Sequence, residues 1–505
     1  MSHPNTIHEL LRRGRDDDPA IGAPGRPALS YADLRAHVAR TVARLNELGI
    51  GRNDAVAIVL PNGPEMASAF ISIAAAATTA PLNPAYRRDE FRFYLNDLQA
   101  GLLVVEAGSQ SPALEVAEEL GIDVATLGFD ASGPAGLFEL EGTARRSRSD
   151  GFAAPEDIAL VLHTSGTTSR PKIVPLTQRN VCASAANVAA SIALAPTDRC
   201  LNIMPLFHIH GLVAAVLASL EAGASVHCTP GFNALQFFRW IEEVRPTWYT
   251  GVPTMHQAIL ARAARNAETA KAGYLRLIRS SSASLPPQVM AELEAVFGAP
   301  VIEAYGMTEA AHQMASNPLP PKQRKPGSVG LPAGPEVSIM DERGELLPAG
   351  RIGEIVIRGP NVTQGYKNND AANATAFTNG WFRTGDQGVM DEDGYFRLTG
   401  RLKEIINRGG EKISPREVDE VLLDHPAIAQ VLTFAVPHPK LGEDVAAAVV
   451  LAEGADADEQ SIRAFAAERL ADIKVPRTIV FLDEIPKGAT GKLQRIGLAE
   501  KLGLA

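Results

Sequence analysis

The stretch that decides the fold is DAVAIVLPNGPEMASAFISIAAAAT, Asp54 to Thr78. It begins with a short apolar run closed by Pro-Asn-Gly-Pro, which predicts a buried strand ending in a turn. The alanine-rich remainder predicts a helix whose small side chains pack closely on a sheet. A second apolar run at Gly101–Gly108 precedes a second helical pattern at Ala113–Gly121. Strands that alternate with helices predict an α/β fold with a largely parallel sheet covered on both faces.

The pattern changes after about Ser328. The runs VSIMDERGELL and GEIVIRG predict hairpin-forming strands that turn at Glu-Arg-Gly, and hence a small β-rich module. Charge and glycine then cluster at Leu398–Pro415, before a compact α+β pattern. We therefore predict a large N-terminal domain, residues 1–400, made of layered α/β subdomains plus the β-rich module. A small mobile α+β C-terminal domain, residues 401–505, follows it.

Composition and charge exclude several classes of protein. The chain has 505 residues, 46% hydrophobic and 21% charged, which is typical of a globular protein with more than one core. A formal net charge of −10 argues against non-specific nucleic-acid binding. The most apolar runs are broken by Pro81 and Glu221, so we interpret them as buried helices rather than membrane spans.

The cysteines and the N-terminus indicate the compartment. Cys182, Cys200 and Cys228 lie far apart, without the spacing of a disulfide framework or a thiolate zinc site. The first residues carry charges where a signal peptide needs an apolar core. We therefore expect a cytoplasmic protein with small-molecule partners, without a nucleic-acid or membrane partner, that is a monomer or a homodimer.

A loop rich in hydroxyl groups, HTSGTTSRPK (His163–Lys172), follows the apolar strand Ile158–Leu162. Small hydroxyl residues with a glycine can direct backbone N–H and side-chain O–H groups at phosphate oxygens, and Arg170 and Lys172 add positive charge. The order of a Walker A loop is absent. The loop therefore predicts a polyphosphate site of another kind.

Three further motifs follow in order: YGMTE (Tyr305–Glu309), WFRTGD (Trp381–Asp386) and PKGATGK (Pro486–Lys492). With the hydroxyl-rich loop, they resemble the adenylate-forming acyl-CoA synthetase superfamily over almost the whole chain. The resemblance implies an AMP-forming acid-thiol ligase that uses ATP, Mg²⁺ and coenzyme A. Such an enzyme first joins an acid to AMP and then transfers the acyl group to a thiol. The resemblance also implies that the small domain rotates about a hinge between the two half-reactions.

The resemblance implies a role for individual residues. Lys492, Thr308 and Glu309 are the expected catalytic residues, and Thr167 with Glu309 the expected Mg²⁺ ligands. Contacts with ATP and coenzyme A are expected from Thr164, Ser165, Gly166, Thr167, Thr168, Lys172, Ser282, Ala283, Glu303, Ala304, Tyr305, Gly306, Asp386, Arg401, Lys403, Gly409 and Gly410. These types suit the chemistry, because a carboxylate and the α-phosphate are both anionic and the transition state needs cations and hydrogen-bond donors.

Some of these roles are specific. Tyr305 is expected to stack on adenine, and Asp386 and Arg401 to bind the ribose. Lys403 corresponds to the hinge position, while Gly409 and Gly410 correspond to a strand beside the path of the pantetheine chain.

The acid substrate is expected to contact three segments: PLFHIHG, RSSSASL and the residues after YGMTE. They carry His208, His210, Ser282 and His312, where relatives that act on fatty or aromatic acids have apolar or small side chains. A buried polar group without a partner costs roughly 1 to 3 kcal/mol, so this pocket favours an acid with a second carboxylate. The histidine matching His208 is common to the superfamily, whereas the other three residues resemble the oxalate-CoA ligase subgroup.

We therefore expect oxalate to be the acid, with His210, Ser282 and His312 binding its distal carboxylate. A larger second anion, such as that of malonate, would favour an arginine, and we expect none from these segments. A ligase for malonate or a medium-chain acid, and a luciferase-like oxygenase that uses the adenylate, remain alternatives. A further question concerns Ile173, where relatives have glycine after the loop lysine. Because a β-branched residue avoids positive φ, either this position is extended or the loop differs locally.

Overall fold

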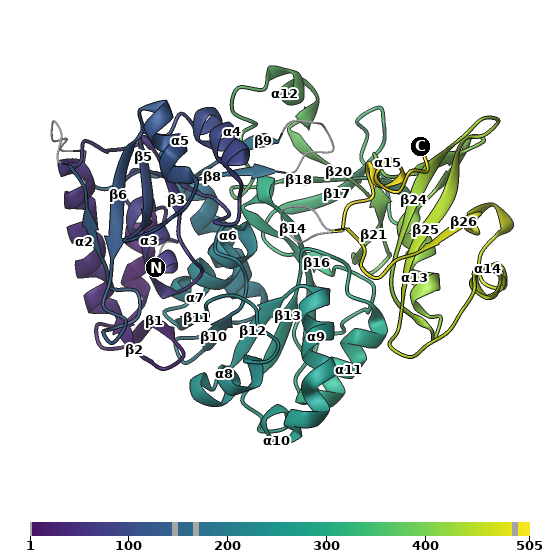
Figure 1. Ribbon diagram of the computed structural model, residues 1–505, viewed down its shortest axis with the longest axis horizontal. Helices are drawn as coiled ribbons and strands as arrows, with labels where there is room; N and C mark the ends of the chain where they lie inside the picture. The colour runs from purple at the N-terminus through teal and green to yellow at the C-terminus, as the bar shows by residue number, and fades with distance from the viewer. Residues whose placement is uncertain (1–2, 144–149, 165–170, 487–492) are drawn as a thin grey trace. The chain divides into compact units, whose positions relative to one another are not determined.

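The computed structural model describes residues 3–143, 150–164, 171–486 and 493–505. This described part divides into two compact units (Figure 1). The first unit contains the described residues up to Val337 together with Ile357–Phe382. The second contains Ser338–Val356 and the described residues from Arg383 onward.

Two largely parallel sheets build the first unit, as the alternation of strands and helices predicted. In spatial order, the first sheet contains β7 (Glu139–Glu141), β6 (Asp123–Gly128), β5 (Leu102–Glu106), β3 (Ala55–Val59), β4 (Thr78–Pro81), β8 (Ile158–Thr164) and β9 (Lys172–Thr177). The second contains β16 (Leu331–Pro332), β15 (His312–Ser316), β14 (Val301–Met307), β13 (Leu277–Ser280), β12 (Trp248–Gly251), β10 (Arg199–Asn202), β11 (Ser225–Cys228), β1 (Pro19–Ala23) and β2 (Arg26–Ser30). Antiparallel pairs occur at the edges of both sheets.

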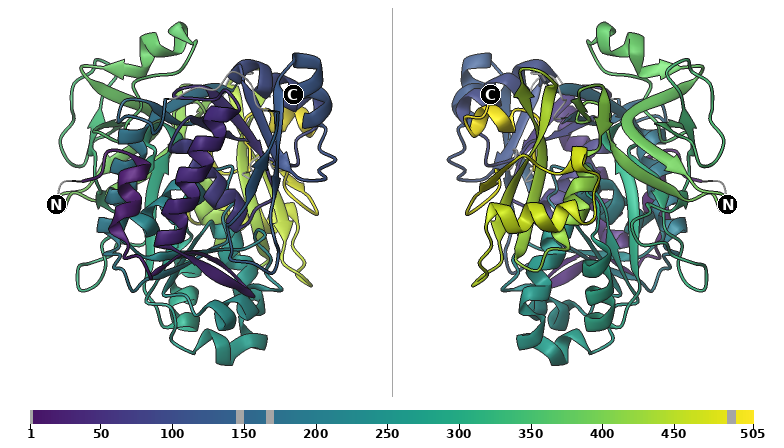
Figure 2. Two further views of the ribbon diagram at one scale, coloured as in Figure 1. Left: turned by 90° about the vertical axis from the view of Figure 1, so that its left-hand side faces the viewer. Right: turned by 90° about the vertical axis from the view of Figure 1, so that its right-hand side faces the viewer.

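Helices cover the faces of both sheets (Figures 1 and 2). The helices of the first unit are α1 (Ile7–Leu10), α2 (Tyr31–Glu47), α3 (Pro64–Ala74), α4 (Arg88–Leu98), α5 (Ala113–Leu120), α6 (Gln178–Ser191), α7 (Ala218–Glu221), α8 (Phe237–Val244), α9 (Pro253–Ala263), α10 (Ala267–Ala270), α11 (Pro287–Phe297) and α12 (Asp370–Ala376). Helices α3 and α6 contact both sheets. Helices α4 and α5 pack on the first sheet, while α8, α9 and α11 pack on the second.

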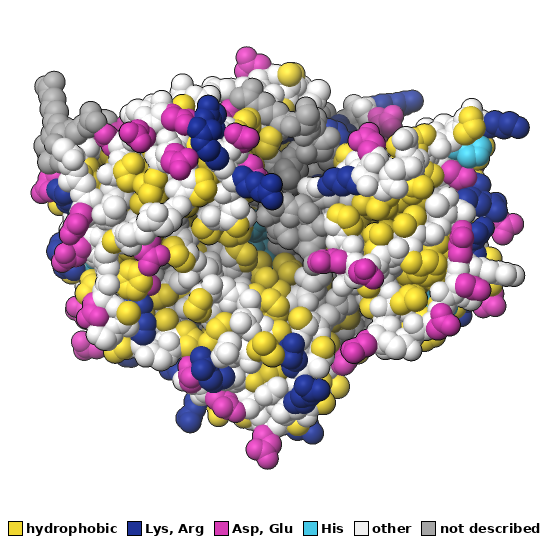
Figure 3. Space-filling view, viewed as in Figure 1, with side chains coloured by type: hydrophobic (Ala, Val, Ile, Leu, Met, Phe, Trp, Pro, Cys, Tyr) yellow, Lys and Arg dark blue, Asp and Glu magenta, His cyan; other side chains and the backbone are white. Residues whose placement is uncertain are grey.

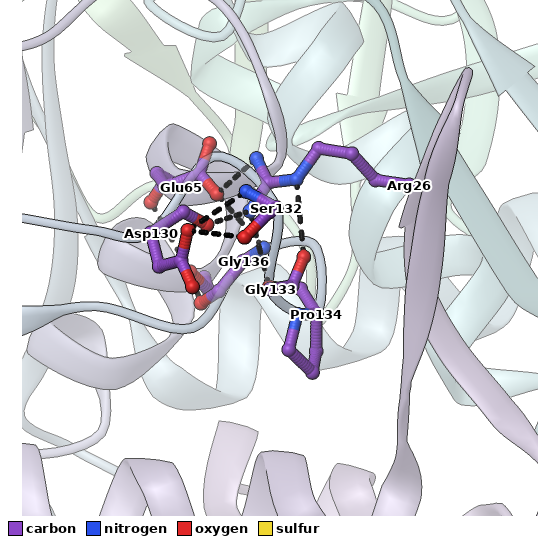
Figure 4. Close-up of polar contacts among 8 residues, drawn as sticks. Arg26, Glu65, Asp130, Ser132, Gly133, Pro134 and Gly136 are labelled. Atoms are coloured by element: carbon purple, nitrogen blue, oxygen red, sulfur yellow. Dashed lines mark hydrogen bonds and ion pairs between the residues drawn. The ribbon is translucent and has the colours of Figure 1, made fainter.

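Helix α3 shows why the opening stretch folds as it does. Proline occupies its first position, where the missing N–H costs nothing, and every residue of the helix is buried. An arginine from β2 holds its N-terminal end: Arg26 donates to Glu65 Oε1 (2.7 Å) and to the carbonyls of Asp130 and Pro134 (Figure 4). The N–H of Gly136 donates to the same Glu65 oxygen (3.1 Å). These hydrogen bonds hold the loop of residues 130–136 against the N-terminal end of α3, which is a structural role.

The apolar run that is broken by Glu221 also forms a buried helical segment, as predicted, but its first part is not α-helical. His210–Leu217 is π-helical and is continued by α7. A Cβ on Gly211 would lie 2.4 Å from the Pro205 carbonyl oxygen, so only glycine fits there. Within the described ranges, the helices lack the length and hydropathy that a bilayer crossing requires. The three cysteines are buried thiols outside any disulfide.

The β-rich module and the C-terminal part contain two further sheets. The first has the order β17 (Glu336–Met340), β18 (Ile352–Arg358), β20 (Trp381–Met390) and β19 (Phe377–Thr378), with β21 (Phe396–Arg401) on β20. The other has the order β23 (Glu411–Ile413), β22 (Ile406–Arg408), β25 (Gly442–Leu451) and β24 (Ile428–His438), with β26 (Thr478–Phe481) on β25. Helices α13 (Pro415–Leu423) and α14 (Glu459–Ala467) pack on this sheet, and α15 (Leu498–Lys501) lies near the end of the chain.

The described surface carries charges of both signs. On the face drawn in Figure 3, lysine and arginine side chains are interspersed with aspartate and glutamate. This distribution agrees with the acidic net charge of the sequence and offers no extended basic stripe among the described side chains in view.

Candidate active site

The YGMTE motif forms a tight hairpin between β14 and β15. Gly306 pairs with Gln313, and Met307 with His312, in antiparallel register. A Cβ on Gly306 would lie 1.6 Å from the carbonyl oxygen of His312, so the hairpin requires glycine at this position. The turn between the strands is a short 3₁₀ helix, Thr308–Ala310, which carries two of the predicted catalytic residues.

Glu309, on this turn, is linked to the strand that follows the hydroxyl-rich loop. Its carboxylate Oε1 accepts a hydrogen bond from the Tyr366 hydroxyl (2.9 Å). The Lys172 ammonium lies 4.3 Å from the centroid of the Tyr366 ring, within reach of a cation–π interaction. Burial raises the pKa of Tyr366, and the nearby Glu309 carboxylate raises it further. The fold therefore brings Lys172 to the ring face and Glu309 to the hydroxyl of one tyrosine, which no sequence motif had indicated.

The donor set at this hairpin is compatible with Mg²⁺. Glu309 supplies a carboxylate, and Mg²⁺ prefers oxygen ligands. Thr167, the other predicted ligand, lies outside the described residues. So do Ser165, Gly166, Thr168 and Lys492. Thr164 ends β8, and Ile173 is a buried residue of β9 rather than a positive-φ residue. The extended alternative for Ile173 is therefore correct.

Asp386 and Arg401, predicted to share the ribose, lie opposite each other on paired strands of the second unit. They are register partners in the antiparallel pair β20–β21. Arg401 Nε donates to Asp386 Oδ1 at 3.0 Å. Asp386 is buried whereas Arg401 is exposed, so the pair has one solvent-accessible side.

His210 and Ser282, two of the predicted acid-binding residues, are in direct contact. His210 is fully buried at the start of the π-helical segment, and its Nδ1 lies 3.0 Å from Ser282 Oγ. The ring of His312 lies beside that of His210, with 5.0 Å between the ring centroids. Three segments that are far apart in the sequence thus supply one polar cluster, which we call the histidine–serine cluster (His210, Ser282 and His312).

Two members of this cluster have backbone conformations that non-glycine residues rarely adopt. The φ angle of Ser282 is +72° and that of His312 is +102°. Such conformations cost of order 1–3 kcal/mol each, and they persist where the surrounding structure or function demands them. Strain at two neighbouring polar residues is therefore typical of a functional site.

The remaining predicted residues lie near the histidine–serine cluster, on the strand β14, or in the second unit. His208 is partly exposed and its Nδ1 accepts from the His210 N–H at 3.3 Å. Glu303 is buried, and its carboxylate accepts from the Leu285 N–H at 3.1 Å, which secures the loop that contains Ser282 and Ala283. Ala304 and Tyr305 are buried, whereas Lys403, Gly409 and Gly410 are exposed.

The expectation that the pocket segments supply no arginine is wrong. Arg279, the first residue of RSSSASL, is fully buried on β13 and donates to Gln313 Oε1 at 2.9 Å. Its Nη1 lies 3.4 Å from His210 Nε2 and 3.5 Å from Thr250 Oγ1. An arginine within a short buried strand gives no sign in the sequence of the direction in which its side chain points. The structure thus adds Arg279 and Thr250 to the surroundings of the histidine–serine cluster.

Comparison with known proteins establishes the family. Residues 11–367 match the family described as AMP-binding enzyme, and residues 417–492 match the AMP-binding enzyme C-terminal domain. The oxalate-CoA ligase of Arabidopsis thaliana is 47% identical over 95% of this chain and 94% of that protein. The oxalate-CoA ligase of Saccharomyces cerevisiae is 42% identical over 89% of this chain and 87% of that protein. A crystal structure of ATP-bound MatB from Rhodopseudomonas palustris matches with a TM-score of 0.88 and 31% identity, covering 98% of each chain. This chain therefore belongs to the family of AMP-binding enzymes.

Proposed function

We propose that this protein is an oxalate-CoA ligase. It joins oxalate to the α-phosphate of ATP with release of diphosphate, and then transfers the oxalyl group from AMP to the thiol of coenzyme A. The net reaction is oxalate + ATP + CoA giving oxalyl-CoA + AMP + diphosphate. The two relatives named for this activity, at 47% and 42% identity over most of the chain, support the proposal.

The observation that carries the choice of acid is the contact of His210 with Ser282 beside the ring of His312. His210 is hydrogen-bonded through both ring nitrogens, and such a polar cluster suits an acid with a second polar group better than an apolar acid. An alkyl or aryl acid offers no polar group beyond its reacting carboxylate. Oxalate offers a second carboxylate only one bond away, so its size and charge suit a compact cluster.

The nucleotide is proposed to contact the β14–β15 hairpin, the strand end at Lys172 and the Asp386–Arg401 pair. Mg²⁺, held by Glu309 and Thr167, supplies positive charge that offsets the phosphate charge. The hydrogen bond from the Tyr366 hydroxyl to Glu309 Oε1 would hold this carboxylate in place as a ligand. We also propose that the functional division follows residues 1–400 and 401–505, with Lys403 at the hinge and Gly409 and Gly410 beside the coenzyme A path.

Malonate is the second candidate, and Arg279 is the observation that favours it. Arginine binds carboxylates in a fixed bidentate geometry, so a buried guanidinium near the cluster suits any short acid with a second anion. The distinction between the two acids therefore depends on length, not on charge.

The test is the rate of AMP formation that depends on both ATP and coenzyme A. Oxalate, malonate, glyoxylate, acetate, octanoate and coumarate should be compared by kcat/KM with the purified protein. We expect oxalate to exceed glyoxylate and acetate by roughly 10- to 100-fold, the value of one or two hydrogen bonds to a charged group. A preference for malonate would replace the acid within the same reaction class, and a preference for a monocarboxylate would overturn the assignment of the cluster.

Replacement of His312 by alanine is expected to raise KM for oxalate by roughly 10- to 100-fold, because a hydrogen bond to a charged group is lost. KM for ATP should change little. His227→Ala, which removes a histidine from β11 of the same unit, is the matched control and should leave both constants near their wild-type values. Unchanged oxalate turnover in His312→Ala would remove this residue from the acid site.

A further inference from the structure

Arg279 is a buried cation that is hydrogen-bonded to a histidine, a threonine and a glutamine rather than to a carboxylate. Its side chain has no solvent exposure, and its contacts are Gln313 Oε1, Thr250 Oγ1 and His210 Nε2. Among the described residues, no carboxylate forms an ion pair with it. Burial lowers the pKa of Arg279 to about 9, which measures how unfavourable the environment is for its charge. Such a group is expensive to keep in a core, which points to a role beyond packing.

The sheet places Arg279 and Thr250 side by side. They are register partners on the adjacent parallel strands β13 and β12, so their side chains emerge on the same face of the sheet. The ring of His210 contacts both of them: its Nε2 lies 2.6 Å from Thr250 Oγ1 and 3.4 Å from Arg279 Nη1. The two strands therefore present two polar groups to one nitrogen of one buried histidine.

The donors in this arrangement fix the position of the histidine proton. A guanidinium can only donate hydrogen bonds, so Arg279 donates to His210 Nε2 and to Thr250 Oγ1. Because His210 Nε2 accepts from Arg279, it carries no hydrogen, so the Thr250 hydroxyl 2.6 Å away donates to it. That nitrogen is thus an acceptor, and the proton of the neutral ring resides on Nδ1.

The proton on Nδ1 in turn orients Ser282. Nδ1 faces Ser282 Oγ at 3.0 Å, so the serine oxygen accepts from His210 and directs its own hydrogen away from the ring. Ser282 is partly exposed, in contrast to the fully buried His210 and Arg279. A directed series of hydrogen bonds therefore runs from a buried cation to the hydroxyl hydrogen of a partly exposed serine, which is a donor suited to an anion.

We propose that Arg279 is a positioning residue that holds His210 as the Nδ1-protonated neutral tautomer and thereby makes Ser282 a hydrogen-bond donor to the second carboxylate of the acid. The inference rests on the proposed function, because that carboxylate is the group that receives the Ser282 hydrogen. Without the arginine, His210 Nε2 can carry the proton, and Ser282 then donates to Nδ1 rather than to the substrate. Arg279 acts through two other residues and need not touch the acid.

The first test uses the wild-type protein and no ligand. Nitrogen-15 NMR distinguishes the two neutral tautomers of histidine, and the His210 signals can be assigned by their loss in His210→Gln. We expect Nδ1 to be protonated and Nε2 to be unprotonated. A proton on Nε2 in the wild-type protein would overturn the proposal, whatever the acid substrate proves to be.

The second test uses Arg279→Met and Arg279→Lys, measured with oxalate and with glyoxylate, which lacks the second carboxylate. Arg279→Met is expected to raise KM for oxalate by roughly 10- to 100-fold, with KM values for ATP and glyoxylate near wild type and with mixed His210 tautomers. Arg279→Lys, which restores a buried donor, is expected to recover part of the oxalate affinity. The control Arg276→Met removes a nearby arginine that pairs with Asp198 instead, and it should preserve the ratio of the two KM values.

The outcomes separate this inference from the proposed function. If the wild-type protein prefers oxalate and Arg279→Met retains that preference, the positioning role is wrong while the function stands. If the wild-type protein prefers a monocarboxylate, the proposed function fails, and the tautomer measurement still decides whether Arg279 sets the state of His210. An equal rise of KM for oxalate and glyoxylate in Arg279→Met would mean a general packing role and would overturn the proposal.

Discussion

Replacement of Arg495 by methionine is expected to destabilise the C-terminal sheet by about 3–5 kcal/mol, the usual cost of removing one partner from a buried ion pair. The guanidinium of Arg495 contacts the carboxylates of Asp419 and Glu404, the latter at 3.1 Å, and donates to the Thr433 carbonyl at 3.0 Å. It therefore connects α13, β24 and the segment after β21 to the end of the chain. Without it, two carboxylates and a carbonyl lose their shared donor.

The loss should depend on pH in a definite direction. Burial raises the pKa of the Asp419 carboxyl, although Arg495 acts to lower it. A folded-state pKa above the unfolded value means that the folded protein binds the proton more tightly, so stability falls as pH rises through the interval between the two values. Removal of Arg495 raises the folded pKa further. The free energy of unfolding that Arg495→Met loses relative to the wild-type protein should therefore be larger at about pH 7.5 than at about pH 5.

The measurement is amide hydrogen exchange of β24 and β25 in the full-length protein. Each 1.4 kcal/mol is about a tenfold change in protection, so we expect protection to fall by roughly two to four powers of ten. Arg469→Met is the matched control, because Arg469 pairs with its neighbour Glu468 at the surface and should contribute at most about 1 kcal/mol. Equal protection of the two variants would show that the Arg495 contacts do not stabilise this unit.

Replacement of Lys492 by alanine is expected to lower the rate of adenylation by about 100- to 1,000-fold, the usual effect of removing one preorganised donor from a developing negative charge. The thioester step should change little, because the attack of a thiol on a preformed acyl adenylate does not need that cation at the α-phosphate. Lys492 lies outside the described residues, so this prediction rests on the proposed role of the PKGATGK motif.

The two half-reactions can be measured separately. Exchange of labelled diphosphate into ATP reports adenylation, and consumption of supplied acyl adenylate by coenzyme A reports the transfer step. Lys501→Ala, which removes an exposed lysine from α15, is the control and should leave both rates unchanged. Equal loss of both half-reactions in Lys492→Ala would contradict a mechanism in which the small domain adopts a different orientation for each step.

The sequence predicted the layers of the fold because the relevant signals are local. An apolar run followed by a small-residue helix, as in Asp54–Thr78, can bury itself only in a covered sheet, and β3 and α3 occupy that stretch. The contact of Asp386 with Arg401 was predictable for a different reason. Asp386 ends the WFRTGD motif and Arg401 lies in the charged segment Leu398–Pro415, and the antiparallel register of β20 and β21 then places them opposite each other.

The contacts around the histidine–serine cluster and at Glu309 could not be predicted in the same way. Thr250 and Tyr366 lie in no motif, and the segment RSSSASL did not indicate where the Arg279 side chain points. Tyr366 reaches Glu309 across 57 positions of the chain. The π-helical turn at His210 likewise depends on the close approach of Gly211 to the Pro205 carbonyl.

The sequence by itself determined the family, the order of strands and helices, and the chemical types assembled for a reaction between two anions. Those properties depend on residue identity and spacing along the chain, which local propensity and hydrophobic burial convert directly into structure. Only the tertiary structure decided that Arg279 faces His210 rather than a carboxylate, and that Ser282 lies at the accessible end of that series. Strand register and side-chain direction fix such contacts, and both arise from the packing of segments distant in sequence.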